Sequence, residues 1–96
     1  MSTWKELSEN PRLKKIHDER IQILKAIREF FWSAGFQEVE TPLALRFPGQ
    51  EPYLNPVPVR LLDAGKNIYD WHLRTSPEFA LKKLLAAGYE KIFEIG

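Results

Sequence analysis

Residues 10–42 read NPRLKKIHDERIQILKAIREFFWSAGFQEVETP, and this stretch carries the strongest structural pattern in the chain. Asn10 can accept a hydrogen bond from a free N–H group of a first helical turn, and Pro11 is tolerated at the first helical position. Apolar residues then recur every three or four positions up to Gly35, a residue typical of a helix end. The pattern predicts one long helix over 11–34, with an apolar stripe that includes Leu13, Ile16, Ile23, Leu24, Ile27, Phe30 and Phe31.

The residues that follow this helix predict a short strand and then a long loop. Residues 36–45 read FQEVETPLAL, in which Pro42 has no N–H group to give to a strand ladder. The segment is therefore expected at a sheet edge, or at an edge that meets another chain. Residues 46–58 hold four of the seven prolines together with Gly49, and we expect a long ordered loop or a flap over a site there.

Residues 59–96 predict a strand, helix and strand. A turn over 63–67 joins a short strand to a second strand, 68–74, in which apolar and polar residues alternate. The apolar face of this second strand is expected to be buried (Tyr69, Trp71 and Leu73), and the other face is polar (Asp70, His72 and Arg74). A helix is expected to begin at Thr75-Ser76-Pro77-Glu78, with a hydroxyl cap and proline at its first position, and to bury Phe79, Leu81, Leu84 and Leu85. The fold class predicted is α+β, with a mainly antiparallel sheet and flanking helices. Residues 1–10 show no firm period and are interpreted as an N-terminal extension.

Composition bounds the possible functions. The chain has 96 residues, and its 14 basic and 13 acidic residues give a net charge of +1, which argues against a nucleic-acid-binding saddle and a polybasic membrane anchor. It has no cysteine, so neither disulfides nor thiolate chemistry are available. No apolar run is long enough to span a bilayer. We expect one cytoplasmic domain with no membrane partner.

Few residues carry a chemical signature, and no catalytic residue is assigned. Glu38 and Glu40 flank Val39 and could act together on a proton or a cation, although a solvated face or ion pairs with the preceding helix is the plainer interpretation. His17 and His72 lie far apart in sequence, and no metal site is expected.

The stretch Ser76-Pro77-Glu78 is the better candidate for a binding site. It places a carboxylate where a strand passes into a helix, beside free backbone N–H groups, and such a carboxylate could receive a substrate ammonium. The plainer alternative is a helix start with an acidic residue that the helix dipole favours.

Three stretches taken together resemble the start of the catalytic domain of class II aminoacyl-tRNA synthetases, in the lysine branch. Residues 27–42 resemble motif 1, residues 73–85 resemble the amino-acid recognition stretch, and residues 91–96 resemble the approach to motif 2. The resemblance implies that Pro42 lies at a dimer interface and that Glu78, with Ser76 and Pro77, binds the ammonium of the amino acid. It also places Gly49 of the flap among the substrate-binding residues. Residues 11–96 are then a partial catalytic domain, divided into a motif 1 helix and strand (11–45), the flap (46–58) and the strand–helix–strand part (59–96).

Two relatives within this branch differ in what precedes motif 1 and in the flap. Lysyl-tRNA synthetases carry an anticodon-binding barrel before motif 1 and a glycine-glycine-alanine flap after it. Here the flap reads FPGQEPYLNP over 47–56 and only a short stretch precedes the helix. Both features, and the form of Thr75-Ser76-Pro77-Glu78, are more similar to the stand-alone elongation factor P lysine (β-lysine) ligases.

The resemblance also implies a reaction for a larger enzyme. ATP with Mg²⁺ activates the amino acid as an adenylate, and the acyl group passes to a lysine of elongation factor P, or to tRNA in a lysyl-tRNA synthetase. The ATP-binding arginines are expected beyond Gly96, so we expect these 96 residues to be an N-terminal piece that holds no cofactor and is inactive alone. A homodimer and lysine or β-lysine as substrate are expected. A non-catalytic dimerisation or regulatory module is the alternative from another class.

Overall fold

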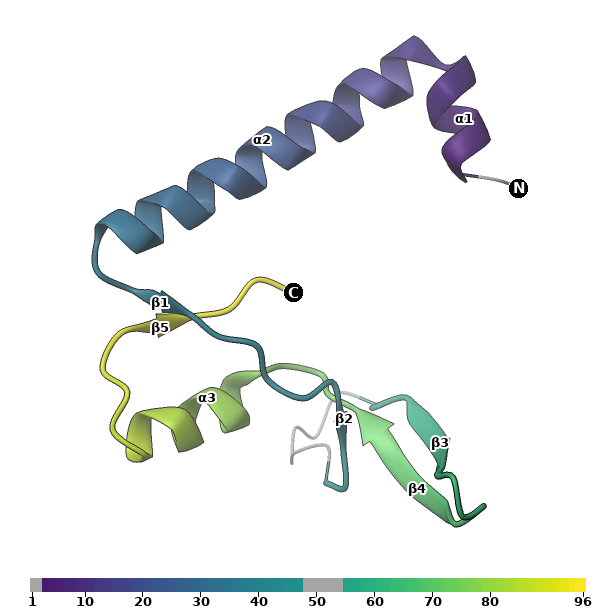
Figure 1. Cartoon of the computed structure of the whole chain (residues 1–96), viewed down its shortest axis with the longest axis vertical. Coiled ribbons are helices and arrows are strands. Elements are labelled where there is room, and N and C mark those ends of the chain that lie inside the picture. The colour runs from purple at the N-terminus through teal and green to yellow at the C-terminus, as the bar shows by residue number, and fades with distance from the viewer. Residues whose placement is uncertain (1–2, 48–54) are drawn as a thin grey trace. The chain divides into compact units, whose positions relative to one another are not determined.

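The computed structural model describes residues 3–47 and 55–96, with helices and strands in the order shown in Figure 1. The chain divides into two compact units, Met1–Glu38 and Val39–Gly96. The mixture of helices and antiparallel strands within them agrees with the α+β prediction. None of the helices in the described part of the chain is both long and apolar enough to cross a membrane.

The first unit contains the predicted long helix. In chain order its elements are α1 (Thr3–Glu9), α2 (Pro11–Ser33) and β1 (Gln37–Glu38). The side chain of Asn10 accepts a hydrogen bond from the N–H of Leu13 at 3.2 Å, and Pro11 is the first residue of α2. The prediction of this helix and its capping residue is confirmed. Helix α1 was not apparent from the sequence, because its few residues show no apolar period.

The end of α2 is fixed by backbone hydrogen bonds around Gly35. The N–H of Phe36 donates to the carbonyl of Phe31 (2.9 Å), and that of Gly35 donates to Trp32 (3.0 Å). Gly35 has a φ of 87°, a conformation that side chains disfavour and glycine adopts freely. The rings of Phe31 and Phe36 then meet edge to face, with 5.4 Å between centroids. Gly35 therefore ends the helix as predicted, and the contact between the two rings accompanies this end.

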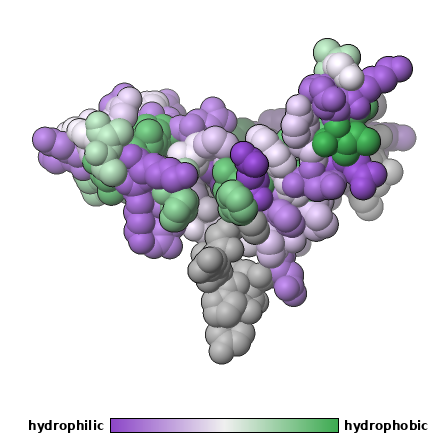
Figure 2. Space-filling view, turned by 90° about the horizontal axis from the view of Figure 1, so that it is seen from below, coloured by the Kyte–Doolittle hydropathy of each residue, from purple (hydrophilic) through white to green (hydrophobic). Residues whose placement is uncertain are grey.

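The apolar stripe of α2 is largely exposed in this chain. Ile23 is 60% exposed and Phe30 is 65% exposed, and no residue of α2 is buried. Figure 2 shows that exposed apolar side chains also occur elsewhere on the surface of the described residues, between polar ones. An amphipathic helix gains most of its stability from packing this face, so the stripe is a surface that can pack on a partner.

The second unit is built on an antiparallel sheet in the order β2–β4–β3. Its strands are β2 (Ala44–Leu45), β3 (Pro58–Leu62) and β4 (Ile68–Leu73). In the register of this sheet, His72 of β4 faces Leu45 on one side and Pro58 on the other. Strands β3 and β4 form the predicted hairpin, whose turn is held by the carboxylate of Asp63. Asp63 accepts hydrogen bonds from Asn67 and from the hydroxyl of Tyr69.

The predicted strand over 36–45 is broken into the short strands β1 and β2. Pro42 has no N–H group, and the N–H of Thr41 donates to a side chain, Glu94, at 3.0 Å instead of to a neighbouring strand. Val39 still donates a backbone hydrogen bond to Phe93 at 2.9 Å. The interruption at Pro42 agrees with the sequence interpretation, and the longer strand does not form.

The second unit ends with α3 (Glu78–Ala86) and β5 (Ile92–Phe93). Leu81 and Leu84 are half-buried, but Phe79 is 67% exposed and Leu85 is 48% exposed, so the predicted four-residue core face is only half correct. Successive residues are about 100° apart on a helix, so Phe79 lies nearly opposite the face on which Leu81 and Leu84 meet the unit, and Leu85 lies to one side of it. Phe93 is buried, with 7% of its surface exposed.

Candidate functional site

The candidate binding residues Ser76, Pro77 and Glu78 lie at the start of α3. Pro77 is the N-cap residue, and its carbonyl accepts the first helical hydrogen bond, from Leu81, at 3.0 Å. The hydroxyl of Ser76 accepts a hydrogen bond from the N–H of Glu78 at 3.1 Å. Relative to the start of the helix, Ser76 and Pro77 therefore lie one position earlier than predicted. The serine hydroxyl caps a free N–H group, although Ser76 is not the N-cap residue itself.

The carboxylate of Glu78 is accessible and already accepts an ammonium group. Its side chain is 66% exposed, and the Nζ atom of Lys82, one helical turn later, lies 3.0 Å from its Oε1 atom. Lys83, the next residue, lies over the ring of Phe79 at 4.8 Å from the centroid. An exposed i,i+4 ion pair of this kind contributes only about 0.3–0.5 kcal/mol, so another cation can replace Lys82 at little cost.

The remaining predicted site residues are placed as follows. Pro42 is exposed beside β2, in the second unit, which leaves it open to a partner. Gly49 lies outside the described residues, so the structure does not test its predicted place in the flap. Ser76 and Pro77 are half-buried and adjoin the exposed carboxylate of Glu78.

A buried ion pair lies in the second unit, at the end of β4. The Nη2 atom of Arg74 is 2.9 Å from Oε1 of Glu94, and these side chains are only 10% and 4% exposed. Thr41 joins both partners: its N–H and hydroxyl donate to the carboxylate of Glu94 at 3.0 and 2.7 Å, and its carbonyl accepts from Nη1 of Arg74 at 3.2 Å. The Nη1 atom of Arg74 also contacts the hydroxyl oxygen of Thr41. We call Thr41, Arg74 and Glu94 the Arg74 cluster.

The surroundings of Glu94 favour its charged form. Burial raises the pKa of the Glu94 carboxyl, but the hydrogen bonds from Thr41 and the charge and hydrogen bond of Arg74 outweigh it, so this pKa lies below its ordinary value of 4.5. Breaking either side of such a buried pair leaves an unpaired charge, which is strongly destabilising.

The sequence analysis did not identify the Arg74 cluster. Alternation along the strand places Arg74 on a polar, exposed face, whereas its side chain is only 10% exposed. On the face predicted to be buried, Tyr69 is 44% and Leu73 38% exposed. Alternation treats a charged residue as solvated, and only the pairing with Glu94, twenty residues later, makes its burial favourable. The available signal was that all members lie inside the three stretches that carry the family resemblance.

Glu38 has a structural role within the first unit. Its Oε2 atom accepts a hydrogen bond from Nε of Arg28 on α2 at 2.8 Å, with both side chains about one-third exposed (30% and 35%). This contact confirms the plainer interpretation of Glu38, an ion pair with the preceding helix. For Glu38 and Glu40 the structure gives no support to a shared proton or cation site.

The histidines are not brought together either. His17 is exposed on α2, whereas His72 lies in β4, where its Nδ1 atom is buried without a hydrogen-bond partner among the described residues. Within the ranges 3–47 and 55–96, no three acidic or histidine side chains lie close enough to hold a metal ion.

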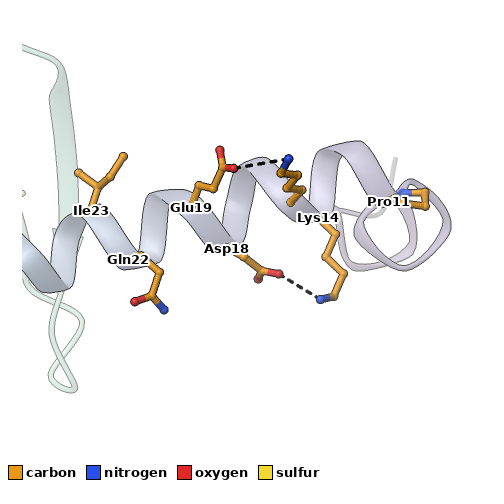
Figure 3. Close-up of a pocket in the computed structure, with 7 residues that line it drawn as sticks. Pro11, Lys14, Asp18, Glu19, Gln22 and Ile23 are labelled. Atoms are coloured by element: carbon orange, nitrogen blue, oxygen red, sulfur yellow. Dashed lines mark hydrogen bonds and ion pairs between the residues drawn. The ribbon is translucent and has the colours of Figure 1, made fainter.

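A shallow hollow on α2 offers no site. Figure 3 shows that the residues lining it all come from this one helix. Its charged side chains pair with each other one turn apart, Lys14 with Asp18 at 3.1 Å and Lys15 with Glu19 at 4.0 Å. The hollow is therefore an exposed part of the helix surface, and the charged side chains that line it are already paired.

The described residues do not fit ATP with its magnesium ion. Of the cations near the start of α3, Arg74 is buried in its ion pair, Lys82 is paired with Glu78, and Lys83 lies over Phe79. A triphosphate needs several converging cations or backbone N–H groups, and magnesium needs carboxylate oxygens. No step that involves the nucleotide is therefore assigned to the described residues.

Comparison with known proteins identifies the family. Residues 2–96 match the family model of tRNA synthetases class II (D, K and N). The chain is 43% identical over 72 residues to a homologue of elongation factor P–(R)-β-lysine ligase from Aquifex aeolicus. This match covers 75% of the chain and 24% of that protein. It is 38% identical over 91 residues to a lysylphosphatidylglycerol biosynthesis bifunctional protein of Gordonia bronchialis, covering 95% of the chain and 8% of that protein.

The chain is also 38% identical over 89 residues to a lysine–tRNA ligase of Pelotomaculum thermopropionicum, which covers 90% of the chain and 16% of that enzyme. It thus spans less than a quarter of the length of each of these relatives. The family model, however, covers almost every residue of the chain, including the Ser76–Glu78 turn and the Arg74 cluster. This chain belongs to the class II tRNA synthetases (D, K and N).

Proposed function

We propose that this chain forms the amino-acid-binding part of an ATP-dependent lysine ligase, in which Glu78 binds the ammonium group of lysine or β-lysine. The observation that carries the proposal is the exposed carboxylate of Glu78, which accepts the ammonium of Lys82 at 3.0 Å at the start of a helix. A substrate ammonium has the same charge and hydrogen-bond donors as Nζ of Lys82. Hydrogen bonds to charged groups are worth roughly 1.5–3 kcal/mol when the site excludes water.

Ser76 and Pro77 support this role by fixing the backbone that carries the carboxylate. Proline restricts φ, and Pro77 adopts a φ of −82° at the helix start. The hydroxyl of Ser76 engages the N–H of Glu78. Because this turn is held locally, binding an ammonium loses little additional conformational entropy.

Lysine is the proposed amino acid because it recurs in the names of the related proteins. These are a β-lysine ligase homologue, a lysylphosphatidylglycerol biosynthesis protein and lysine–tRNA ligases. We propose elongation factor P as the acceptor, in the cytoplasm, on the strength of the Aquifex relative and the Thr75-Ser76-Pro77-Glu78 form of the recognition stretch. A tRNA acceptor is the second candidate, and the lysine–tRNA ligases among the relatives support it.

We further propose that the active form is a homodimer. The apolar stripe of α2 is exposed over several turns, and Pro42 is exposed as well. A second copy is the occupant proposed for this stripe, since burying residues such as Ile23 and Phe30 removes apolar surface from water.

Pyrophosphate exchange tests the activity and then separates the acceptors. The protein made from the complete reading frame that contains this chain should exchange pyrophosphate into ATP in the presence of lysine or (R)-β-lysine, but not glutamate. Labelled amino acid should then appear on elongation factor P and not on tRNA; the reverse result would favour the tRNA ligase. Absence of exchange with either form of lysine would contradict the proposal and favour a non-catalytic module.

A further inference from the structure

We propose that Arg74 is a positioning residue, which sets the place of the Glu78 carboxylate by joining three chain segments behind it. This inference rests on the proposed function of Glu78, because it concerns how the same site is held. Arg74 lies at the end of β4, four residues before Glu78, and its contacts reach the segments around Pro42 and around Glu94.

Two hydrogen bonds from Arg74 hold the backbone on either side of Pro42. The backbone N–H of Arg74 donates to the carbonyl of Leu43 at 2.8 Å, and its guanidinium donates to the carbonyl of Thr41 at 3.2 Å. Pro42 itself has no N–H group with which to fix its own segment. Arg74 therefore helps to hold the chain both before and after Pro42.

The guanidinium of Arg74 also contacts the segment that follows β5. The guanidinium pairs with the carboxylate of Glu94 at 2.9 Å. A Cβ atom placed on Gly96 would lie 3.3 Å from Nη2 of Arg74, so the backbone at Gly96 passes close to the same group. Because a guanidinium has five donors in a fixed plane, it can bind these groups simultaneously; a lysine ammonium cannot reproduce that geometry.

The link from Arg74 to Glu78 is short and stiff. Only Thr75 lies between Arg74 and Ser76, Pro77 restricts the backbone, and the hydroxyl of Ser76 accepts a hydrogen bond from the N–H of Glu78. A shift of the Arg74 backbone is therefore transmitted to Glu78 and cannot be absorbed by a flexible loop. Displacements of about 1 Å at a binding or catalytic group can reduce rates as much as a hundredfold.

A purely structural role and a positioning role predict different results when both charges are removed together. A buried ion pair that is replaced as a pair often leaves stability unchanged, whereas loss of one partner destabilises strongly. In R74M/E94Q no buried charge is left alone, and the side-chain amide introduced by E94Q can still accept from the N–H of Thr41. This variant should therefore keep the fold while losing the planar group that joins the segments.

The test measures the Michaelis constants for lysine and for ATP by pyrophosphate exchange, in the protein made from the complete reading frame, together with its urea midpoint. In R74M/E94Q the constant for lysine should rise roughly tenfold while that for ATP stays within about twofold. The matched control is R60M/D70N, which removes an exposed Arg–Asp pair (72% and 79% exposed) from the adjoining strands and should leave both constants unchanged. Should R74M/E94Q unfold, R74K, which keeps the charge opposite Glu94, is used and the same selective rise for lysine is expected.

A folded variant with an unchanged lysine constant overturns the proposal, as do equal rises in both constants. E78Q, measured alongside, separates this outcome from failure of the proposed function. If E78Q raises the lysine constant and the Arg74 variants do not, Arg74 is structural and the role of Glu78 stands. If E78Q also leaves the lysine constant unchanged, the proposed function itself is wrong and the positioning role falls with it.

Discussion

Arg74 and Glu94 form an almost completely buried ion pair, with 2.9 Å between Nη2 and Oε1 and side chains that are 10% and 4% exposed. The N–H and hydroxyl of Thr41 also donate hydrogen bonds to this carboxylate. The pair therefore links three segments that are far apart in sequence. The contribution of this pair to the free energy of unfolding can be measured, and so can the dependence of that contribution on pH.

Removing one partner of this pair should be costly. In E94Q the guanidinium of Arg74 is left buried without a counter-charge, and the free energy of unfolding should fall by about 3 kcal/mol. The matched control is D70N, which breaks the exposed pair with Arg60 and should cost less than about 1 kcal/mol. Urea unfolding at neutral pH measures the loss of free energy of unfolding in each variant. Equal effects of the two substitutions would mean that burial does not govern the energy of the Glu94 pair.

Acid should weaken the fold through Glu94. The pKa of Glu94 is lower in the folded protein than its ordinary value of 4.5, so its contribution to stability is complete above that pH and is lost as the pH falls through the folded pKa. The free energy of unfolding of the wild-type protein should therefore decrease on acidification below 4.5. The decrease should be smaller in E94Q, as followed by urea unfolding at a series of pH values. Parallel curves for the two proteins would contradict the lowered pKa.

Local signals in the sequence were sufficient to predict the elements near the site. Asn10, Pro11 and Gly35 gave the bounds of α2, and the polar turn at Asp63 gave the hairpin. These features depend on contacts within a few residues, which a sequence displays directly. The Ser76-Pro77-Glu78 turn was found for the same reason, with an error of one position at the helix start.

Contacts between distant segments could not be predicted in this way. Arg74 is buried because Glu94 and Thr41 converge on it from other parts of the chain, and alternation along β4 contains no information about them. The predicted core face of α3 failed for a different reason: on a helix of 3.6 residues per turn Phe79 lies nearly opposite Leu81 and Leu84, so the four predicted residues do not share one face.

Lys82 should compete weakly with the substrate for Glu78. Its ammonium pairs with the carboxylate at 3.0 Å, with Lys82 itself 68% exposed, and must move when a substrate ammonium binds. In K82M the apparent constant for lysine should therefore fall by about twofold, which corresponds to the roughly 0.3–0.5 kcal/mol of an exposed i,i+4 pair. K83M is the control, because Lys83 lies over Phe79 and does not contact Glu78. A rise in the lysine constant in K82M would show that Lys82 assists binding.

The apolar stripe of α2 should hold the proposed homodimer together. Ile23 lies in this stripe and is 60% exposed, so I23E places a charge where the second copy is proposed to pack. Sedimentation velocity should show a dimer for the wild-type protein and a shift toward monomer for I23E. Q22E, on the adjacent and polar side of the helix, should remain dimeric. A wild-type monomer at tens of micromolar would contradict the proposed homodimer.

The most direct test of the binding role is the replacement of Glu78 by glutamine. E78Q keeps the shape of the side chain and removes the charge, so the apparent constant for lysine in pyrophosphate exchange should rise by about tenfold or more. The constant for ATP should change little, and E90Q, which neutralises an exposed glutamate beyond α3, should change neither. A lysine constant in E78Q equal to that of the wild-type protein would contradict this account, and Glu78 would then be only an acidic residue favoured by its helix start.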